Sequence, residues 1–488
     1  MQFFKENKLR ISQVFNLNKS QAELDFIDIE LETDISLFLD PHFLANKNDR
    51  WSQEATRTIR SFFQHLLNLL ISHQLDHAKQ LFQNLYEPNE TCLGLSKRKP
   101  QGHGVGPKDT NKIFENILQS KAMKSGLVGD LEDFIIFVDN FNKDKLSDMT
   151  TNIIRMHLIN YTQEQCQLWN IPLTSSIQSG PFWNKSANSW NNIYTEMLVI
   201  DSKRYLLVPK GVVSYIKEYT HQRFHRYFAL HFLQQEHLRL NTALVQMRKR
   251  KDGSIERYVT KKSLIENELP GTKYDLNAFV EKHPQIFQDF KNAMKKPSVS
   301  LENKDFSKVE ITEIAAFLKD KLIAIPLGHK GATQFHDCII GILELLFYPE
   351  LICPQKEHEI HNGRKRIDIT FDNAARNGLF FELSKSLSCQ FLFIECKNYK
   401  GDPKNPELDQ LSGRFSPNRG KVGILVCREI DNLSLFCKRC SDTYKDDRGL
   451  ILPLMDTDLL EVLDSYLEGR PKQLSEMLRL RRRNIQIN

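Results

Sequence analysis

The stretch Phe391-Leu-Phe-Ile-Glu-Cys-Lys397 reads as a short apolar β-strand that ends in two charged side chains. Side chains alternate along a strand, so Glu395 and Lys397 project from the same face, one pleat apart. The apolar residues place this strand inside a sheet, where charges are costly unless they have a partner or a chemical role. The same spacing at Glu6-Asn-Lys8 and Glu302-Asn-Lys304 lies in polar surroundings. The copy at 395–397 is therefore the one that indicates a site.

The preceding strand supplies a second acid. In Gly363-Arg-Lys-Arg-Ile-Asp-Ile-Thr370, the two isoleucines face one side, and Asp368 faces the other side with two of the arginines. If this strand pairs with the Glu-x-Lys strand, Asp368 and Glu395 converge on one point. Two carboxylates, together with water and a phosphate oxygen, form the kind of hard-ligand site that Mg²⁺ prefers. The backbone carbonyl of Cys396 could complete such a site.

The surrounding sequence alternates between apolar strands and helices. We expect strands at Lys365–Phe371, Phe391–Cys396 and Val422–Cys427, and helices at Gln334–Phe347, at Glu407–Arg414 and over most of Ser434–Tyr466. Buried strands that alternate with helices indicate an α/β layer architecture.

This order of elements resembles the core of the PD-(D/E)XK phosphodiesterases, the restriction-endonuclease-like nucleases. The resemblance covers about Phe335–Leu463 and implies a mixed central sheet flanked by helices. It also implies that Asp368 and Glu395 bind the metal, and that Lys397 orients the attacking water or helps to deprotonate it. Mg²⁺, or Mn²⁺ in its place, would lower the pKa of that water and neutralise charge on the phosphate. The sequence departs from the family at Ile367, where many members have Pro.

Further site residues are implied by the same resemblance. Many members carry an acid on the helix before the Asp strand, and Glu344 is the best match here. Asp337 lies seven residues earlier, about two turns along the same helix face, and His336 is a further polar candidate. Asp409-Gln410-Leu-Ser-Gly413 resembles the Gln-bearing helix of Mrr-type restriction enzymes, which implies that Gln410 lies near the site.

Each of these assignments has a structural alternative. Glu395 and Lys397 could form an ion pair at a strand end, and Asp368 could pair with Arg366 or Arg364. Glu344 could be a solvated or ion-paired helix acid, His336 a structural histidine and Gln410 a packing or capping residue. Cys437-Lys-Arg-Cys440 has zinc-like spacing, but it has no second pair nearby, so we interpret it as a coincidence.

Basic clusters predict contacts with nucleic acid, although a solvated charge run is their default interpretation. Arg248, Lys249, Arg250 and Lys251 precede the turn residues Asp252-Gly253, which predicts a basic β-hairpin arm. Cations that neutralise phosphates add sequence-independent affinity, and a two-stranded ribbon fits a DNA groove. Arg364 and Arg366 are further candidates, and Arg479–Arg483 resembles a basic tail. The glycine-rich stretch Ser96–Pro107 follows no apolar strand, so we expect a surface loop rather than a phosphate site.

Length and composition limit the architecture. The 488 residues predict two or three domains. We expect an α/β module at 1–240, a hairpin arm and helical connector at 241–305, a nuclease-like domain at 306–470 and a basic tail at 471–488. The net charge is +6, from 67 basic and 61 acidic residues, so clustering of charge matters more than its total. Nine scattered cysteines, no secretory signal and no apolar run long enough to span a bilayer favour a cytoplasmic protein without a membrane partner.

The sequence therefore predicts a Mg²⁺-dependent nuclease, most readily a DNA endonuclease of restriction or anti-phage type that acts on double-stranded DNA. The N-terminal module would recognise substrate, sense a trigger or mediate assembly, and a homodimer would allow both strands to be cut. Two alternatives stay open. One is a nucleic-acid-binding or regulatory protein whose nuclease core does not cut, and the other is an RNase with the same site.

Overall fold

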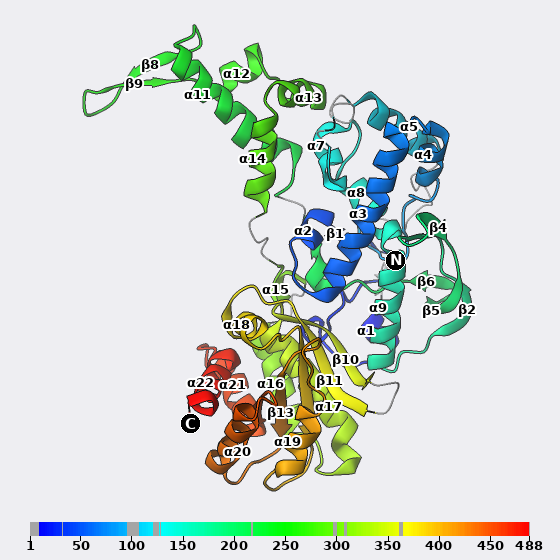
Figure 1. Cartoon of the computed structure of the whole chain (residues 1–488), viewed down its shortest axis with the longest axis vertical. Helices are drawn as coiled ribbons and strands as arrows, with labels where there is room; N and C mark the ends of the chain where they lie inside the picture. Colours follow the sequence, from blue (N-terminus) through cyan, green and yellow to red (C-terminus); the bar gives the residue numbers. More distant parts are fainter. Residues whose placement is uncertain are drawn as a thin grey trace, which may run out of the picture.

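The computed structural model describes residues 9–31, 33–94, 107–120, 126, 128–215, 218–295, 300–306, 310–360 and 365–487. Within these ranges the chain is a mixed α/β protein with one five-stranded sheet and several smaller ones. Figure 1 shows a C-terminal part built on the large sheet, an N-terminal part beside it, and an arm that extends away from both.

The N-terminal part is mainly helical. Its longer helices are α3 (Arg50–Ile71), α4 (Leu75–Phe82), α5 (Pro107–Gln119), α8 (Lys143–Ile153) and α9 (Arg155–Leu168), and its short ones are α1 (Ile11–Val14), η1 (Gln21–Glu23), α2 (Pro41–Ala45), η2 (Leu131–Asp133), α7 (Phe134–Phe137) and η3 (Lys210–Val212). Its small sheets pair β1 (Phe38–Leu39) with β7 (Val213–Ser214), β3 (Phe182–Asn184) with β4 (Ser189–Asn191), and β2 (Thr174–Gln178) with β5 (Tyr194–Ile200) and β6 (Lys203–Tyr205). In α3, the buried side chains Ile59, Phe62, Phe63 and Leu66 recur at helical spacing and form the face that enters the core.

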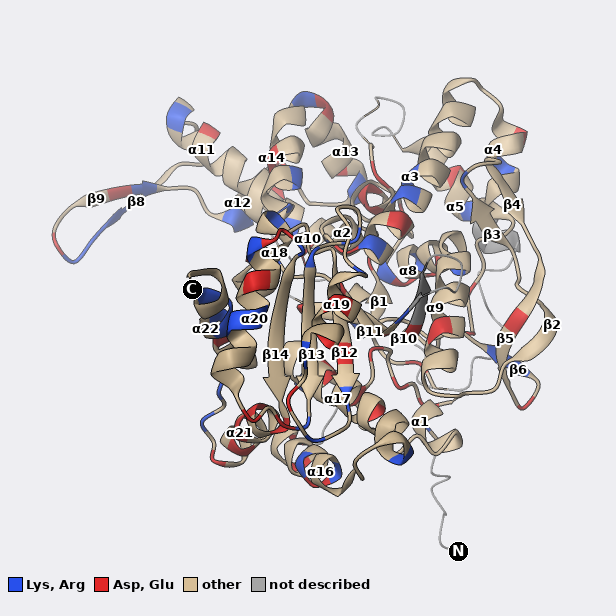
Figure 2. Ribbon diagram, turned by 60° about the horizontal axis from the view of Figure 1, so that its bottom comes forward, with Lys and Arg blue, Asp and Glu red and all other residues tan. Residues whose placement is uncertain are grey.

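The arm contains the predicted basic hairpin. Its elements are α10 (His221–Phe224), the π-helical turn η4 (His225–Ala229), α11 (Leu230–Leu240), β8 (Gln246–Lys249), β9 (Ile255–Tyr258), α12 (Lys261–Asn267), α13 (Lys273–Lys282) and α14 (Pro284–Met294). Gly253 adopts a positive φ of 85° in the turn between β8 and β9, a conformation that glycine adopts without strain. Figure 2 shows this hairpin projecting from the body, with basic residues along β8.

The C-terminal part is built on one mixed sheet. Its strands are β10 (Leu351–Ile360), β11 (Lys365–Asn373), β12 (Phe391–Lys397), β13 (Val422–Cys427) and β14 (Leu450–Met455), in that spatial order. β10, β11 and β12 pair antiparallel, whereas β12, β13 and β14 pair parallel. The helices of this part are α15 (Asn303–Phe306), α16 (Ile311–Ala324), η5 (His329–Gly331), α17 (Ala332–Phe347), α18 (Gly378–Ser386), α19 (Asn405–Ser412), α20 (Leu433–Lys445), α21 (Asp456–Leu467) and α22 (Leu474–Ile487). Every residue of β13 is buried, as expected for a strand with neighbours on both sides.

The hydrophobic core is shared between the N-terminal part and the C-terminal part. One continuous cluster of buried apolar residues runs through both parts. Lys210 and Glu344 also form an ion pair across the junction, 3.0 Å apart, with both side chains fully buried. The two parts therefore pack as one body.

Several elements differ from the sequence prediction. The apolar run Phe134–Val138 predicts a strand but contains the helical turn α7. The helical pattern from His225 to about Met247 predicts one long helix, but the helix ends at Leu240. The predicted basic tail is the packed helix α22, in which Arg481 and Asp458 form an ion pair 2.6 Å apart. Paired arginines on a packed helix are not available as a free cationic tail.

Among the described residues, the helices are all too short or too polar to cross a bilayer.

Candidate active site

Asp368 and Glu395 lie on the same face of two adjacent antiparallel strands. Ile369 of β11 is opposite Ile394 of β12, so the next residue of each strand, Asp368 and Glu395, projects to a common side. Asp368 Oδ2 accepts a hydrogen bond of 2.9 Å from the backbone N–H of Cys396. This bond holds the Asp368 carboxylate against β12 and beside Glu395, as the sequence predicted.

Three polar side chains surround the Glu395 carboxylate. Lys397 Nζ donates to Glu395 Oε1 at 3.0 Å, and Gln410 Nε2 donates to the same oxygen at 2.6 Å. Arg414 Nη1 lies 3.1 Å from Glu395 Oε2. Lys397 also donates to Gln410 Oε1 at 3.1 Å, which closes the cluster. The predicted residues Glu395, Lys397 and Gln410 are thus brought together.

Burial sets the electrostatics of this cluster. The Glu395 side chain is 2% exposed, whereas Asp368 is 22% and Lys397 16% exposed. Burial raises the pKa of Glu395, the nearby Asp368 carboxylate raises it further, and Lys397 and Arg414 oppose this shift. The site therefore pairs the buried Glu395 carboxylate, whose negative charge is disfavoured, with the more accessible Asp368 carboxylate.

Close packing between α19 and β13 positions Gln410 and Arg414. A Cβ at Gly423 would lie 2.9 Å from Leu411 Cδ2, so a larger residue there would require the Leu411 side chain to shift. Gln410 lies on α19, and Arg414 follows the end of this helix four residues later, so both side chains project to the same side. Both side chains consequently reach Glu395.

His336 on α17 also approaches the site. Its Nε2 lies 3.8 Å from Asp368 Oδ2, and its buried Nδ1 has no hydrogen-bond partner. Burial lowers the pKa of His336, and the charge of Asp368 works against this. The neutral imidazole is thus favoured next to a carboxylate.

Glu344, predicted as a site residue, lies elsewhere. Its carboxylate pairs with Lys210, and the other charges that influence it are Asp25 and Lys19 of the N-terminal part. Burial raises the pKa of Glu344 to about 8. Glu344 and His336 are eight residues apart on α17, about 12 Å along the helix axis. The prediction for Glu344 is wrong because the ion pair with Lys210 buries it at the junction.

The donor set fits a divalent cation that keeps water or phosphate among its ligands. Two carboxylates lie side by side, and the buried Glu395 Oε2 makes no hydrogen bond, although the Arg414 guanidinium lies 3.1 Å from it. The described part of the chain contains no group of three or more His, Cys, Asp or Glu side chains arranged to hold a metal ion. Mg²⁺ usually binds one or two carboxylates and takes its remaining ligands from water and substrate. Cys396, predicted to offer its carbonyl, contacts Asp368 through its N–H.

The residues predicted to bind nucleic acid fall into three groups. Arg364 lies outside the described residues, and Arg366 lies 3.6 Å from Glu357. On the hairpin, Arg248 and Arg250 both form ion pairs with one acid, at 2.5 and 2.7 Å from the Glu256 carboxylate. Lys249 and Lys251 are exposed beside them. The lysines are therefore the more available cations of the arm. The predicted loop at 96–106 also lies outside the described residues.

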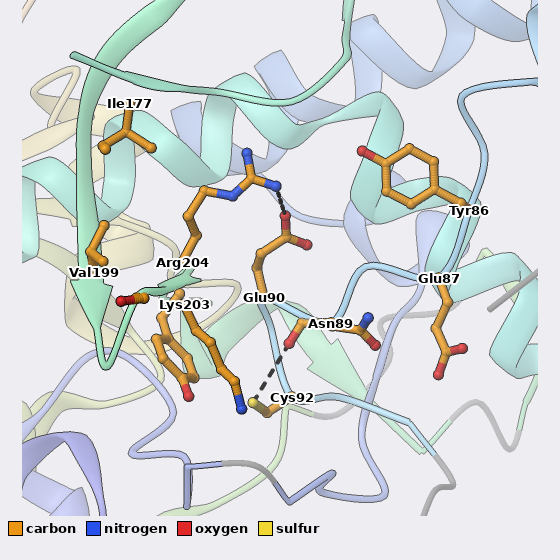
Figure 3. A pocket seen from close by; sticks show the side chains of 11 residues that line it. Tyr86, Glu87, Asn89, Glu90, Cys92, Ile177, Val199, Lys203 and Arg204 are labelled. Carbon is orange, nitrogen blue, oxygen red and sulfur yellow. Dashed lines mark hydrogen bonds and ion pairs between the residues drawn. The ribbon is translucent and has the colours of Figure 1, made fainter. Parts of the chain in front are cut away.

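A cavity in the N-terminal part has a different character. It has a volume of about 630 Å³ and is lined by Tyr86, Glu87, Glu90 and Arg204 among others (Figure 3). Glu90 accepts hydrogen bonds from the buried Arg155 at 2.9 Å and from Arg204 at 3.0 Å. These arginines lower the pKa of Glu90 although burial opposes them. The negative charge of Glu90 is thus already matched within the protein.

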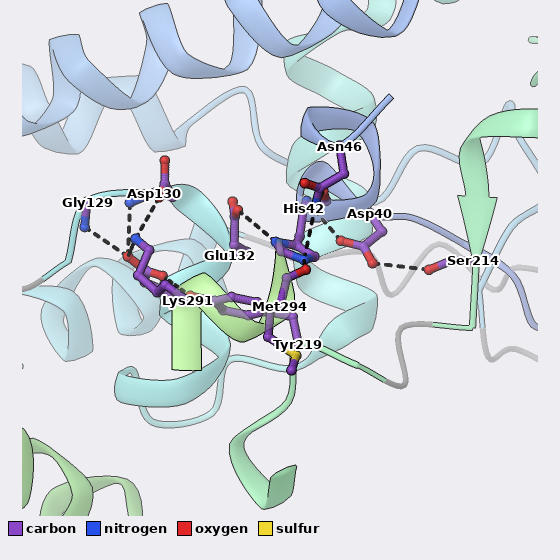
Figure 4. Close-up of polar contacts among 11 residues, drawn as sticks. Asp40, His42, Asn46, Gly129, Asp130, Glu132, Ser214, Tyr219, Lys291 and Met294 are labelled. Carbon is purple, nitrogen blue, oxygen red and sulfur yellow. Dashed lines mark hydrogen bonds and ion pairs between the residues drawn. The ribbon is translucent and has the colours of Figure 1, made fainter. Parts of the chain in front are cut away.

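A second polar network attaches the arm to the N-terminal part (Figure 4). Lys291 of α14 lies 2.6 Å from Asp130 and 3.1 Å from Asp133. His42 lies 3.6 Å from Glu132, and its Nε2 is 3.0 Å from the carbonyl oxygen at the end of α14. The acids here are partnered by cations of neighbouring elements, which indicates a structural role.

Sequence reasoning missed Arg414 and gave too little weight to His336. Arg414 follows Gln410 by four residues, a spacing that places both on one helix face and is visible in the sequence. For His336 the sequence offers no such signal, because its approach to Asp368 depends on how α17 packs against the sheet.

Comparison with known proteins gives one match. A family described as "Domain of unknown function (DUF8370)" matches residues 16–220, which cover most of the N-terminal part. No curated protein and no solved structure matches the chain.

Proposed function

We propose that this protein is a metal-dependent nuclease whose active centre is formed by Asp368, Glu395 and Lys397. One observation carries the proposal: the two carboxylates share a face of adjacent strands, and the lysine is hydrogen-bonded to one of them. Polar groups converge here at the end of a buried strand, where an unused charge would only destabilise the fold.

Each residue has a defined part in this proposal. Asp368 and Glu395 would hold Mg²⁺ or Mn²⁺, which lowers the pKa of a bound water and offsets charge on the phosphate. Lys397 lies beside the carboxylates and can donate to the attacking water or to a phosphate oxygen. Gln410 donates to Glu395 and accepts from Lys397, so it fixes the orientation of both. Arg414 lies beside the second oxygen of Glu395.

We further propose double-stranded DNA as the substrate. The hairpin β8–β9 projects from the body and carries Lys249 and Lys251 on its exposed surface (Figure 2). A two-stranded ribbon with cations fits the major groove, and its phosphate contacts would hold a duplex near the sheet. A cut through both strands needs two active centres, which favours a homodimer.

Incubation with plasmid DNA and with RNA in Mg²⁺, in Mn²⁺ and in EDTA tests the proposal. We expect cleavage with either metal and none in EDTA. Asp368→Ala and Lys397→Ala should abolish it, while the exposed pair Asp446→Ala and Lys438→Ala serve as matched controls. Cleavage that persists in both Asp368→Ala and Lys397→Ala would show that the active centre lies elsewhere in the chain. The same panel separates DNA from RNA as the polymer.

A second candidate is a nucleic-acid-binding protein that does not cut. The observation that favours it is that both oxygens of Glu395 already have protein partners: Lys397 and Gln410 donate to Oε1, and the Arg414 cation lies beside Oε2. This candidate predicts that DNA binding in EDTA equals binding in Mg²⁺, and that no polymer is cleaved under any condition. Cleavage with Mg²⁺ that is lost in Asp368→Ala excludes it.

A further inference from the structure

A cavity of about 350 Å³ lies between the N-terminal part and the large sheet. Its walls come from α3 and α9 on one side and from β10, β11 and β12 on the other. Its volume falls within the range of sites for small molecules. The cavity therefore exists only because the two parts of the chain pack together.

The cavity continues along the sheet face that carries the candidate active site. Thr370 and Phe393 are paired across β11 and β12, and both line the cavity. Asp368 and Glu395 follow two residues further along the same strands and on the same face, a step of about 7 Å. That step is comparable to the distance from a backbone phosphate to its own base.

Several polar groups of the cavity walls have no partner. Trp51 Nε1 and Arg419 Nε are buried donors without a hydrogen bond. Among the described residues, the surroundings of the Asp372 carboxylate provide charges but no hydrogen bond. Buried polar groups are normally paired with protein, water or a ligand. Donors and an acceptor around one cavity fit a ligand that has both kinds of group on its edge.

The charges of the cavity favour a neutral ligand over an anionic one. Burial and the neighbouring acids raise the pKa of Asp372 well above its usual range, which favours the protonated, hydrogen-bond-donating form. The remaining acids of the wall, Glu54 and Glu164, then balance Arg50 and Arg419. The cavity wall therefore carries no net positive charge to attract a phosphate, whereas its polar groups can hydrogen-bond to an uncharged polar ring.

Aromatic rings complete the walls. Trp51 and Tyr161 face each other edge to face at 6.3 Å, and Phe391 lies on the opposite side with the Arg50 guanidinium 5.9 Å from its ring centre. Proteins that hold an unstacked base combine aromatic surfaces with hydrogen bonds to the edge of the base. We propose that this cavity binds one nucleobase of the strand whose phosphate lies at Asp368 and Glu395. This inference rests on the proposed nuclease function.

Binding of free nucleosides tests the cavity without any cleavage. The full chain in EDTA is titrated with deoxyadenosine, deoxyguanosine, deoxycytidine and thymidine, followed by tryptophan fluorescence and by calorimetry. We expect at least one nucleoside to bind and to quench Trp51. Trp51→Phe should abolish that quenching, and Asp372→Leu, which removes the carboxyl group at similar volume, should weaken calorimetric binding by about fivefold to tenfold through one lost hydrogen bond. Asp446→Leu is the matched control and should bind as the wild type does.

Sequencing of the cleaved ends then connects the cavity to the cut strand. The wild type should prefer one base at a fixed position next to the cut, and Asp372→Leu should flatten that preference. Cleavage without any base preference, together with no nucleoside binding, would overturn the inference and leave the nuclease function standing. Absence of cleavage in all polymers, with nucleoside binding intact, would remove the proposed function and with it the role of the cavity in holding a cut strand.

Discussion

Glu395 in the sheet and Glu256 in the hairpin arm both contact cationic side chains, but their pKa values shift in opposite directions. Glu256 accepts hydrogen bonds from Arg250 and Arg248, and because desolvation opposes them only weakly these bonds lower its pKa to about 2. Glu395 contacts Lys397 and Arg414, yet burial raises its pKa. Burial and the neighbouring Asp368 carboxylate therefore outweigh the cationic partners of Glu395, whereas nothing comparable opposes the arginines at Glu256.

This difference indicates which cluster is suited to chemistry. An exposed ion pair gains little free energy and changes nothing in the protein around it. A buried carboxylate beside a second carboxylate has a disfavoured charge, which a divalent cation would relieve. The arm is accordingly a surface for contact, and the sheet end is the place where a metal would change the chemistry.

Asp368→Asn should produce the largest effect on activity. The amide oxygen can still accept the hydrogen bond from Cys396, so the fold should persist, but one metal ligand is lost. We expect cleavage to fall by about a thousandfold or more, with little change in Tm. Because the neighbouring charge is gone, the pKa of Glu395 should also fall, which NMR titration would detect. If this variant cleaves at the wild-type rate, then Asp368 and Glu395 do not hold a catalytic metal. Glu395 would then be a structural ion-paired acid, as Glu256 is.

Gln410→Ala should have an intermediate effect. It removes the donor to Glu395 Oε1 and the acceptor of Lys397, so both side chains lose their fixed orientation. We expect kcat to fall by about tenfold to a hundredfold, as for residues that orient metal ligands, while KM changes little. Gln410→Glu keeps the acceptor but adds a third negative charge and should not restore the rate. An unchanged kcat in Gln410→Ala would mean that Gln410 only packs.

The sequence allowed the inner strands to be predicted but not the edge strands. β12 and β13 are apolar and β11 alternates apolar with polar residues; all three lie inside the sheet, where these patterns are clear. The missed strands, β10 and β14, form the two edges and contain Pro354 and Pro453. Proline is tolerated at a sheet edge because the outward N–H is not needed there, but in a sequence it counts against a strand.

The site was predicted where it depends on local pattern and missed where it depends on packing. Asp368, Glu395 and Lys397 follow from strand alternation, and Gln410 follows from a resemblance on a short helix. Glu344 was wrong because its partner Lys210 is 134 residues away in the sequence, and no local pattern reveals that contact. The apolar run that contains α7 was likewise ambiguous, since a run of four or five apolar residues fits a strand or a helix equally well.

Substitutions in the hairpin arm should have a smaller effect, on the salt dependence of DNA binding. Lys249→Glu with Lys251→Glu should weaken DNA binding and lower the slope of log K against log salt by about 2, one counterion for each lost phosphate contact. Binding measured at several salt concentrations gives this slope. The double variant Lys79→Glu with Lys438→Glu makes the same charge change at other exposed positions. Equal slopes in both double variants would show that the arm does not contact phosphates.

The smallest effect concerns a third carboxylate, Glu344, which extends the comparison from activity to stability. Its pKa is raised from an ordinary 4.5 to about 8 by burial. Between these values the folded protein keeps the proton that the unfolded chain has lost, so stability falls as pH rises. The slope from this group is at most about 1.4 kcal/mol per pH unit. Unfolding measured from pH 4.5 to 8 should show a shallower decline in Glu344→Gln.

Glu256→Gln is the informative counterpart because the pKa of Glu256 is lowered. Its contribution is present above pH 4.5 and is lost only as pH falls toward 2, so this variant should leave the slope between pH 4.5 and 8 unchanged. The difference in slope isolates Glu344 even if the unpaired Lys210 lowers the overall stability of Glu344→Gln. If both variants decline in parallel with the wild type, then Glu344 is ionised throughout this range. Its pairing with Lys210 would then outweigh burial, and burial alone would no longer explain why Glu395 differs from Glu256.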